Sequence, residues 1–477
     1  MEKLRCKHNA QTPNPKFQTP NPKPYTLNFK LQLSVNNLAP KLTNKQYAEN
    51  FAELKPALSP NAATAEAIRC LYCFDSPCMK ACPTHIDIST FIKKIATGNL
   101  KGSAKTILES NWVPLTCAKA CPVDVLCEGA CVYNEGGEKP IQIGRLQRFA
   151  IDNYFEQGMP PLFTPAPKNG RSIGVIGGGP AGLACAAELA LMGYEVTIYE
   201  AKDKAGGLDT WGIAPYKMKH EDSAKEVALV KSFGVKIKTG VNVGNEISIE
   251  KLTKMHVIIF IGVGLGRATR LNIPGEDLEG VVDAQDFIED VTTRKWKSVK
   301  VGKRVAIIGG GNTAIDAATE AKRLGAQQVM MIYRRSREEM SAYEFEQELA
   351  LTDSVEFFFS VMPRKFIGKK SVEAIECVRT KVVNGKVKPV PRSEFKIPID
   401  MVIKALGQTV EESFLSEIPN LKTNQGNVWV NPETYQTSNP KYFAGGDCIN
   451  GGKEVVNAAY DGKSAAHGID AYLSIRS

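Results

Sequence analysis

The sequence predicts an α/β protein in which a small helical N-terminal domain precedes two doubly wound parallel sheets. Eight of the twelve cysteines fall between Cys70 and Cys131, where apolar residues are spaced as in short amphipathic helices and strand-like segments are absent. After residue 165, an apolar strand, a glycine-rich turn and a helix follow one another twice, beginning at Arg171 and at Arg304. Such units build parallel sheets, and 477 residues are enough for about three domains.

The charge and hydropathy of the chain argue against nucleic-acid and membrane partners. Most of the net charge of +9 lies in residues 1–50, which contain eight basic and two acidic residues. The rest is nearly balanced and has no basic groove interleaved with aromatic residues. The longest apolar stretch, residues 257–263, is far shorter than the roughly 20 residues of a spanning helix, and the N-terminus lacks a secretory signal. We therefore expect a cytoplasmic protein.

Residues 1–60 are predicted to form a flexible tail. They contain a direct repeat, because Gln11–Lys16 and Gln18–Lys23 both read Gln-Thr-Pro-Asn-Pro-Lys. Prolines at this density support neither a helix nor a central strand. The helical domain is expected over residues 61–165, with Ser89–Ala96 as one of its amphipathic helices.

The cysteines form two runs that are typical of iron–sulfur proteins. The runs are Cys70-x2-Cys73-x4-Cys78-x3-Cys82-Pro83 and Cys117-x3-Cys121-Pro122 followed by Cys127 and Cys131. Three closely spaced thiolates can hold three corners of a 4Fe-4S cube, and a cysteine before proline often binds the neighbouring cluster. The pattern predicts two interleaved clusters in a reducing compartment. Structural zinc is the alternative, although zinc sites favour two Cys-x2-Cys pairs and only one is present.

The first glycine-rich turn predicts a binding site for FAD or NAD. It reads Gly177-x-Gly179-Pro180-Ala181-Gly182, after an apolar strand and at the start of a helix. Glycines there let the backbone approach a pyrophosphate, which the helix N-terminus also attracts. Glu200 ends the next strand, and an acid at that point accepts hydrogen bonds from a ribose hydroxyl and repels a 2′-phosphate.

The second glycine-rich turn predicts a site for NADPH or NADH. It reads Gly309-x-Gly311-Asn312-Thr313-Ala314, and its alanine is tolerated in this fingerprint. The next strand ends in Arg334 and Arg335, where the first unit has Glu200. Guanidinium groups suit a phosphate, so the pair favours NADPH, with a solvated basic turn as the alternative. Both units are therefore expected to be Rossmann-like.

These motifs together resemble the FAD- and iron–sulfur-dependent NAD(P)H oxidoreductases that include the glutamate synthase small subunit and the N-terminal part of dihydropyrimidine dehydrogenase. The resemblance covers residues 61–477. It implies one 4Fe-4S cluster held by Cys70, Cys73, Cys78 and Cys131, and another held by Cys82, Cys121, Cys127 and Gln147. It implies that FAD also contacts Gly207, Leu208, Gly446 and Asp447, and that Gly407 follows the strand that closes the nicotinamide site. Cys117 is left without a role.

The resemblance further implies that the NAD(P) domain is inserted in the FAD domain. The expected ranges are 166–295 for the first part of the FAD domain, 296–404 for the NAD(P) domain and 405–477 for the second part of the FAD domain. Electrons would pass from NAD(P)H through FAD and the clusters, without a catalytic acid or base, to a partner subunit that bears the substrate-reducing flavin site. Gln147 favours a dihydropyrimidine dehydrogenase. A glutamate synthase small subunit is the alternative, and a zinc-stabilised nucleotide-sensing module is an alternative from another class.

Overall fold

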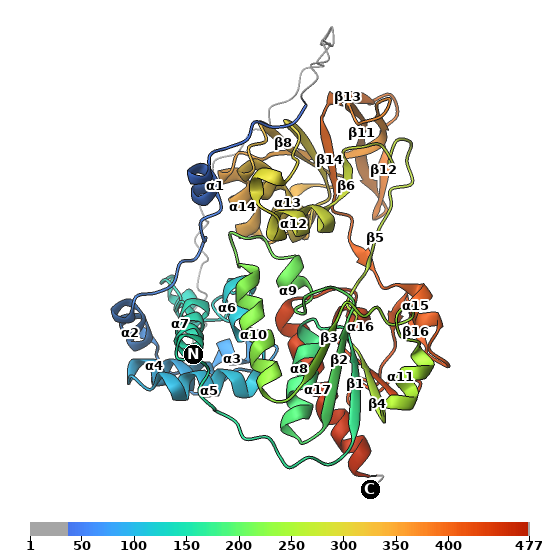
Figure 1. Cartoon of the computed structure of the whole chain (residues 1–477). Coiled ribbons are helices and arrows are strands. Elements are labelled where there is room, and N and C mark those ends of the chain that lie inside the picture. The colour runs from blue at the N-terminus through green and yellow to red at the C-terminus, as the bar shows by residue number, and fades with distance from the viewer. Residues whose placement is uncertain (1–36, 476–477) are drawn as a thin grey trace, which may run out of the picture. The chain divides into compact units, whose positions relative to one another are not determined.

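The computed structural model describes residues 37–475, and residues 1–36 and 476–477 lie outside the described part (Figure 1). The Gln-Thr-Pro-Asn-Pro-Lys repeat falls in the first of these ranges. The prediction of a flexible tail is wrong from residue 38 onward, because helix α1 (Asn44–Asn50) forms there. Thr43 begins this helix through a capping box with Gln46, which satisfies two backbone N–H groups.

Residues 60–156 form the helical body, and the helical character that the sequence predicts is confirmed. Its helices are α2 (Pro60–Arg69), α3 (Pro77–Ala81), α4 (Ile88–Ala96), α5 (Leu100–Ser110), α6 (Pro114–Ala120) and α7 (Ile143–Glu156), with a 3-10 turn at Val132–Gly136. In α4 the buried residues Ile88, Phe91, Ile92 and Ile95 recur every three or four positions, so they share one face. That face packs against α5, α2 and α7 and makes the core of the helical body.

The first α/β body contains a five-stranded parallel sheet in the order β18-β4-β1-β2-β3. Its strands are β1 (Ser172–Ile176), β2 (Glu195–Glu200), β3 (Lys236–Thr239), β4 (Ile258–Ile261) and β18 (Tyr442–Ala444). Its helices are α8 (Pro180–Leu191), α9 (Leu208–Trp211), α10 (His220–Ser232), α11 (Ile249–Met255), α15 (Glu412–Ser416), α16 (Asp447–Asn450) and α17 (Val455–Ser474). A short hairpin, β16 (Thr423–Asn424) and β17 (Asn427–Val428), lies before β18. Figure 1 shows α8 and α17 side by side next to this sheet.

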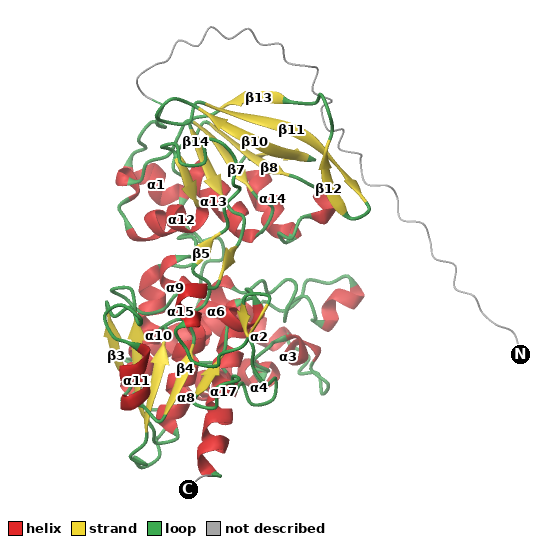
Figure 2. Ribbon diagram, turned by 90° about the vertical axis from the view of Figure 1, so that its right-hand side faces the viewer, coloured by secondary structure: helices red, strands yellow, loops and turns green. Residues whose placement is uncertain are grey.

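The chain leaves the first sheet after β4 and returns to it only at β18, so the second body is inserted between them, as predicted. The outgoing strand β5 (Arg267–Ala268) pairs antiparallel with the returning strand β15 (Gln408–Thr409). Figure 2 shows this two-stranded ribbon between the two sheets.

The second α/β body contains a parallel sheet in the order β6-β14-β7-β8-β9 and an antiparallel sheet. The parallel strands are β6 (Val281–Asp283), β7 (Arg304–Ile308), β8 (Gln328–Tyr333), β9 (Glu356–Phe359) and β14 (Met401–Lys404). The helices are α12 (Ala284–Thr293), α13 (Asn312–Arg323) and α14 (Glu344–Thr352), with 3-10 turns at Trp296–Ser298 and Arg337–Glu339. The antiparallel strands are β10 (Val361–Ile367), β11 (Ala374–Val383), β12 (Lys386–Pro389) and β13 (Phe395–Pro398).

The predicted start of this body at residue 296 is too late. Strand β6 pairs with β14, which places Val281 opposite Val402 in the second sheet. Phe287 and Val291 of α12 are buried in the same core as α13. Residues 281–295 therefore belong to the second α/β body, because their apolar side chains are buried there. Within residues 37–475, no helix has both the length and the apolar character needed to span a bilayer.

Replacing Phe51 with alanine is expected to lower the free energy of unfolding of the second α/β body by about 3–5 kcal/mol. The Phe51 side chain is 3% exposed, and its ring stacks on Trp296 at 4.5 Å between centroids. Thermal unfolding measured by circular dichroism tests this. Leu54→Ala, at a position 41% exposed on the same segment, is the control and is expected to cost about 0.5 kcal/mol. Equal losses in the two variants would contradict the assignment.

Candidate functional site

The first glycine loop, residues 177–182, has the backbone geometry of a dinucleotide cradle. A Cβ atom added at Gly182 would lie 2.0 Å from the carbonyl oxygen of Gly177, so only glycine fits there. A Cβ atom added at Gly179 would meet nothing closer than the Cα atom of Gly207, at 3.7 Å. Gly179 therefore borders open space at the start of α8, where no side chain caps the first backbone N–H groups. Free N–H groups beside a space of this kind suit a pyrophosphate.

Glu200 lies at the end of β2 and is held in place by the backbone. Its Oε2 atom accepts a hydrogen bond from Gly178 N at 2.8 Å, and its Oε1 atom accepts one from Lys202 N at 2.8 Å. The carboxylate is therefore fixed beside the first glycine loop, at the end of the strand where the sequence predicts a contact with ribose.

Two segments that are distant in the sequence meet the first glycine loop. Gly207 faces Gly179, and a Cβ atom added to Gly207 would lie 2.7 Å from the Cα atom of Gly179. Gly446 has a positive φ of 79° and approaches Ala181, while Leu208, next to Gly207, is 43% exposed. Residues 177–182, 207–208 and 446–447 are thus gathered at one end of the first sheet.

Asp447 follows this junction and precedes the long helix α17. Its Oδ1 atom accepts a hydrogen bond from Lys453 N at 3.1 Å, and burial raises the pKa of the carboxyl. Helix α17 begins at Val455, and Glu454 makes no side-chain cap bond there. The N-terminal dipole of a 20-residue helix therefore begins close in sequence to Asp447.

The second glycine loop, residues 309–314, repeats the geometry of the first. A Cβ atom added at Gly309 would lie 2.3 Å from the carbonyl oxygen of Ala405, whereas one at Gly311 would meet only Ser341 Oγ, at 3.4 Å. The side chain of Asn312 accepts a hydrogen bond from Tyr343 N at 3.0 Å, and Thr313 follows it in the first turn of α13. Ala314 is fully buried, which explains why a small residue is needed there.

The arginine pair lies beyond β8, next to the second glycine loop. Arg335 forms an ion pair with Glu339 at 3.2 Å, and both side chains are about one-third exposed. Arg334 is exposed, and its side chain has no hydrogen bond or ion pair with any residue in the described range 37–475. Arg334 is therefore free to bind an anionic ligand.

Gly407 follows β14 and has a φ of 84°. No atom lies within 4 Å of a Cβ atom added at this position.

Four cysteines line one pocket in the helical body. The pocket has a volume of about 30 Å³ and is lined by Cys70, Cys73, Cys78 and Cys131 among apolar residues. Burial raises the pKa of the Cys78 thiol to about 11, and that of Cys70 is raised for the same reason. Soft donors converging from two distant runs fit an iron–sulfur cluster, whose binding would displace the thiol protons.

Three further cysteines lie together at the ends of α3 and α6 and in the loop after α6. A hydrogen bond with Cys117, burial and the nearby Cys127 and Cys82 raise the pKa of Cys121. Burial, Glu128 and Cys82 likewise raise the pKa of Cys127. Cys82, Cys121 and Cys127 are therefore neighbours. Among the described residues, no three His, Cys, Asp or Glu side chains are placed to hold a single metal ion.

Gln147 and Cys117 differ in whether their possible ligand atoms already form hydrogen bonds. Gln147 on α7 is 6% exposed and donates its Nε2 hydrogen bond to the carbonyl oxygen of Pro114 at 2.7 Å. In the described part of the chain its Oε1 atom has no hydrogen-bond donor, so the oxygen is the amide atom left to act as a ligand. Cys117 is 4% exposed, and its sulfur accepts a hydrogen bond from Asn111 Nδ2 at 3.1 Å.

Glu226, which no motif in the sequence singled out, joins α10 to the helical body. Its carboxylate is 1% exposed and accepts hydrogen bonds from Leu115 N at 2.6 Å and Thr116 N at 3.0 Å, at the start of α6. Burial raises its pKa to about 7 despite these bonds. The helical spacing of α10 could have indicated that Glu226 is buried, because it lies on the same helix face as the buried residues Ser223 and Leu229.

Two family models match the chain. Residues 47–159 match dihydropyrimidine dehydrogenase domain II, 4Fe-4S cluster, and residues 171–462 match pyridine nucleotide-disulphide oxidoreductase. The chain belongs to the pyridine nucleotide-disulphide oxidoreductase family. It is an NAD(P)H-dependent oxidoreductase of the FAD- and iron–sulfur-containing type, which confirms the resemblance and favours it over the zinc-stabilised module.

Similar proteins include subunits of two different enzymes. The glutamate synthase [NADPH] small chain of Escherichia coli (strain K12) is 33% identical over 458 residues, covering 91% of this chain and 97% of that protein. The NAD-dependent dihydropyrimidine dehydrogenase subunit PreT of the same organism is 34% identical over 421 residues, covering 88% and 97%. Among solved structures, Mycobacterium tuberculosis FprA in complex with NADPH has a TM-score of 0.53 at 19% identity, covering 65% of this chain and 85% of that one. This structural likeness shows the shared fold of the two α/β bodies.

Gly179→Ala is expected to weaken FAD retention by about five- to a hundredfold, whereas Gly311→Ala is expected to weaken NAD(P)H binding by a similar factor and leave FAD bound. An added Cβ at either position has no close clash within the protein, so it would occupy space meant for a ligand. Flavin absorbance after gel filtration and the KM for NAD(P)H measure the two effects, and each variant is the control for the other. Loss of both ligands in both variants would mean that the substitutions disturb folding instead.

Proposed function

We propose that this chain takes a hydride from NADPH at FAD and passes the electrons singly, through two 4Fe-4S clusters, to a partner subunit of the dihydropyrimidine dehydrogenase type. The observation that carries the proposal is the division of the thiols into two groups. One group lines a single pocket, and the other lies at the ends of α3 and α6 and in the loop after α6. Two separate sets of soft donors support two clusters.

In this proposal each cluster has four protein ligands. The first set is Cys70, Cys73, Cys78 and Cys131, and the second is Cys82, Cys121, Cys127 and Gln147. The hydrogen bond from Gln147 Nε2 to Pro114 supports an oxygen ligand, because it fixes the rotation of the amide. Cys117 is proposed to remain a free thiol, since its sulfur already accepts a hydrogen bond from Asn111.

The protein contributes binding and orientation. When bound, FAD supplies hydride acceptance and single-electron release, and 4Fe-4S clusters supply single-electron transfer. The first glycine loop and Glu200 are proposed to hold the FAD pyrophosphate and ribose, and Asp447 its ribityl chain. The N-terminus of α17 provides a positive dipole that favours negative charge on its ligand. No acid–base side chain is required, because the transferred groups are a hydride and electrons.

The choice of NADPH rests on the contrast between Glu200 and the arginine pair. A fixed carboxylate repels a 2′-phosphate at the first loop, while the exposed Arg334 and the partly exposed Arg335 attract one at the second. We propose Arg334 and Arg335 as the residues that bind the 2′-phosphate, and Gly407 as the backbone position beside the nicotinamide.

The glutamate synthase small chain is the second candidate function. The Tyr333–Glu339 segment, with its arginine pair, resembles the glutamate synthase type. The glutamate synthase small chain of Escherichia coli also matches this chain over most of its own length. Mixing the chain with each type of partner subunit separates the two. Dihydrouracil-dependent reduction of NAD(P)+ supports the pyrimidine route, and glutamine-dependent oxidation of NADPH supports the other.

Arg334→Gln and Arg335→Gln together are expected to lower kcat/KM for NADPH by about ten- to a hundredfold and to leave kcat/KM for NADH nearly unchanged. Steady-state kinetics with an artificial electron acceptor measures both values. Arg337→Gln is the matched control, because Arg337 lies in the same segment but is engaged with Gln347 at 3.2 Å. An unchanged preference for NADPH over NADH in the double variant would contradict the proposal that Arg334 and Arg335 bind the 2′-phosphate.

Cys78→Ala is expected to remove about four iron atoms and one of two paramagnetic signals, because alanine offers no donor atom in place of the thiolate. Cys117→Ala is expected to retain the full iron content. Iron and acid-labile sulfide analysis and electron paramagnetic resonance of the anaerobically reduced protein test this. A wild-type protein that held zinc and no labile sulfide would refute the proposed function.

A further inference from the structure

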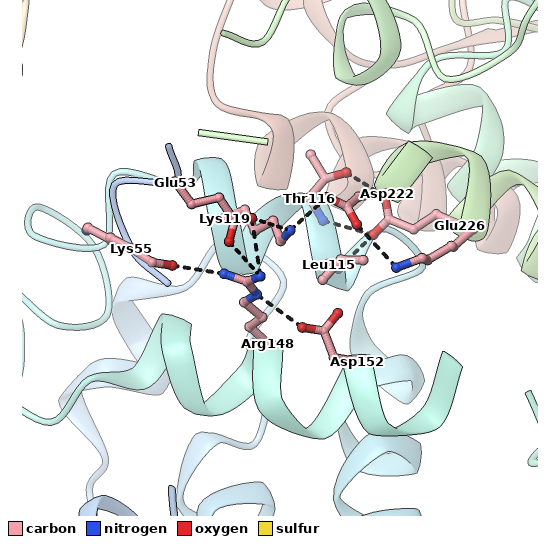
Figure 3. A network of polar contacts seen from close by, with 10 residues as sticks. Glu53, Lys55, Leu115, Thr116, Lys119, Arg148, Asp152, Asp222 and Glu226 are labelled. Carbon is pink, nitrogen blue, oxygen red and sulfur yellow. Dashed lines mark hydrogen bonds and ion pairs between the residues drawn. The ribbon is translucent and has the colours of Figure 1, made fainter. Parts of the chain in front are cut away.

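A partly buried network of polar contacts joins four separate segments of the chain near the second thiol group (Figure 3). The segments are residues 53–55, helix α6, helix α7 and helix α10. Helix α6 leads into Cys121, and helix α7 carries Gln147. The network therefore joins helix α6, which ends just before Cys121, to helix α7, which carries Gln147.

Glu53 is the residue of segment 53–55 that contacts both helices of the helical body. It pairs with Lys119 on α6 at 2.9 Å and with Arg148 on α7 at 3.0 Å. Lys119 and Arg148 have side chains only 5% and 10% exposed. Burial alone would raise the pKa of Glu53, but the two cations hold it below its usual value. Glu53 is therefore charged at neutral pH and connects the two helices.

Helix α10 of the first α/β body completes the network. Asp222 pairs with Lys119 at 2.7 Å, and Glu226 accepts the backbone N–H groups at the start of α6. Figure 3 shows Lys119 between Glu53 and Asp222, and Arg148 between Glu53 and Asp152. Each buried cation thus has two carboxylate partners, which is the condition under which buried charges are tolerated.

Residues 38–56 connect Glu53 to the second α/β body, and we call them the strap. At one end, Ala39 N donates a hydrogen bond to the carbonyl oxygen of Val301 at 2.9 Å, and Phe51 stacks on Trp296. Near the other end, Leu54 N donates to the carbonyl oxygen of Tyr216 at 3.0 Å, and the Tyr216 side chain is buried in the core of the second α/β body. At that end, Arg148 and Arg145 of the helical body donate to the carbonyl oxygens of Lys55 and Pro56. The strap thus joins the second α/β body to the helical body.

We infer that Glu53 is a positioning residue for the second cluster: through Lys119 and Arg148 it holds α6 and α7 against α10, and the strap links that arrangement to the second α/β body. The inference rests on the proposed function, since it takes Cys121 and Gln147 as cluster ligands. Its physical basis is that removing one member of a buried charge network leaves its partners uncompensated. Loss of Glu53 leaves Lys119 and Arg148 with one carboxylate each, and the two helices are then less firmly held.

The test uses the full-length holoprotein with Glu53→Gln, which keeps the size of the side chain and removes its charge, and Glu53→Ala. Reductive titration followed by electron paramagnetic resonance is expected to show an upward shift in the midpoint potential of the second cluster, because a nearby negative charge is lost. The potential of the first cluster stays unchanged. Hydrogen exchange is expected to become about tenfold faster in α6, α7 and residues 44–52 alike. Glu53→Asp is expected to restore the potential in part.

Glu49→Ala is the matched control, because Glu49 lies on the same strap but, among residues 37–475, its side chain pairs only with the exposed Lys45, at 3.9 Å. This variant is expected to change neither the midpoint potential of either cluster nor the rate of hydrogen exchange in α6 and α7. Loss of the second cluster alone in a Glu53 variant supports the inference. Equal shifts of both clusters, loss of both, no shift at all, or an equal effect of Glu49→Ala would overturn it. Iron, sulfide and flavin content of the wild-type protein tests the proposed function separately.

Discussion

Close approach of backbone segments around the start of α8 is the constraint on which the rest of the structure depends. Gly182 packs on the carbonyl oxygen of Gly177, and Gly462 packs on that of Ala181, so that an added Cβ would lie 2.0 Å from oxygen in both cases. These contacts bring β1, α8 and α17 together, although α17 lies almost 300 residues further along the chain. A larger residue at position 182 or 462 would push these elements apart. The space between Gly179 and Gly207 would then change.

The sequence was sufficient to predict the parts of the fold that depend on local pattern. Strand β7 and the glycine-rich turns were predicted at their observed positions, because an apolar run, glycines and a helix start are all contiguous. The grouping of Cys70, Cys73 and Cys78 with Cys131 came from a family resemblance, and these four residues do line one pocket. Spacing alone would not have excluded Cys117, whose engagement by Asn111 depends on the packing of α5 against α6.

The parts that the sequence did not predict depend on long-range contacts. Residues 38–60 read as a tail because prolines precede them, yet Tyr47 and Phe51 find a partner in Trp296, some 250 residues away. Strand β6 was missed because it is three residues long and is defined only by pairing with β14. Glu53, Asp222 and Glu226 look like ordinary surface acids in the sequence, since their cationic and backbone partners come from other bodies.

The insertion of one α/β body into the other has a consequence for how the chain folds as it is synthesised. Every strand of the inserted body lies between residues 281 and 404, so that body can be completed before Tyr442 leaves the ribosome. Until then β4 remains an unpaired sheet edge, because its outer neighbour β18 has not yet been made. An apolar open edge invites pairing with other chains. Nascent chains that stall after β4 but before Tyr442 are therefore exposed to aggregation through this edge.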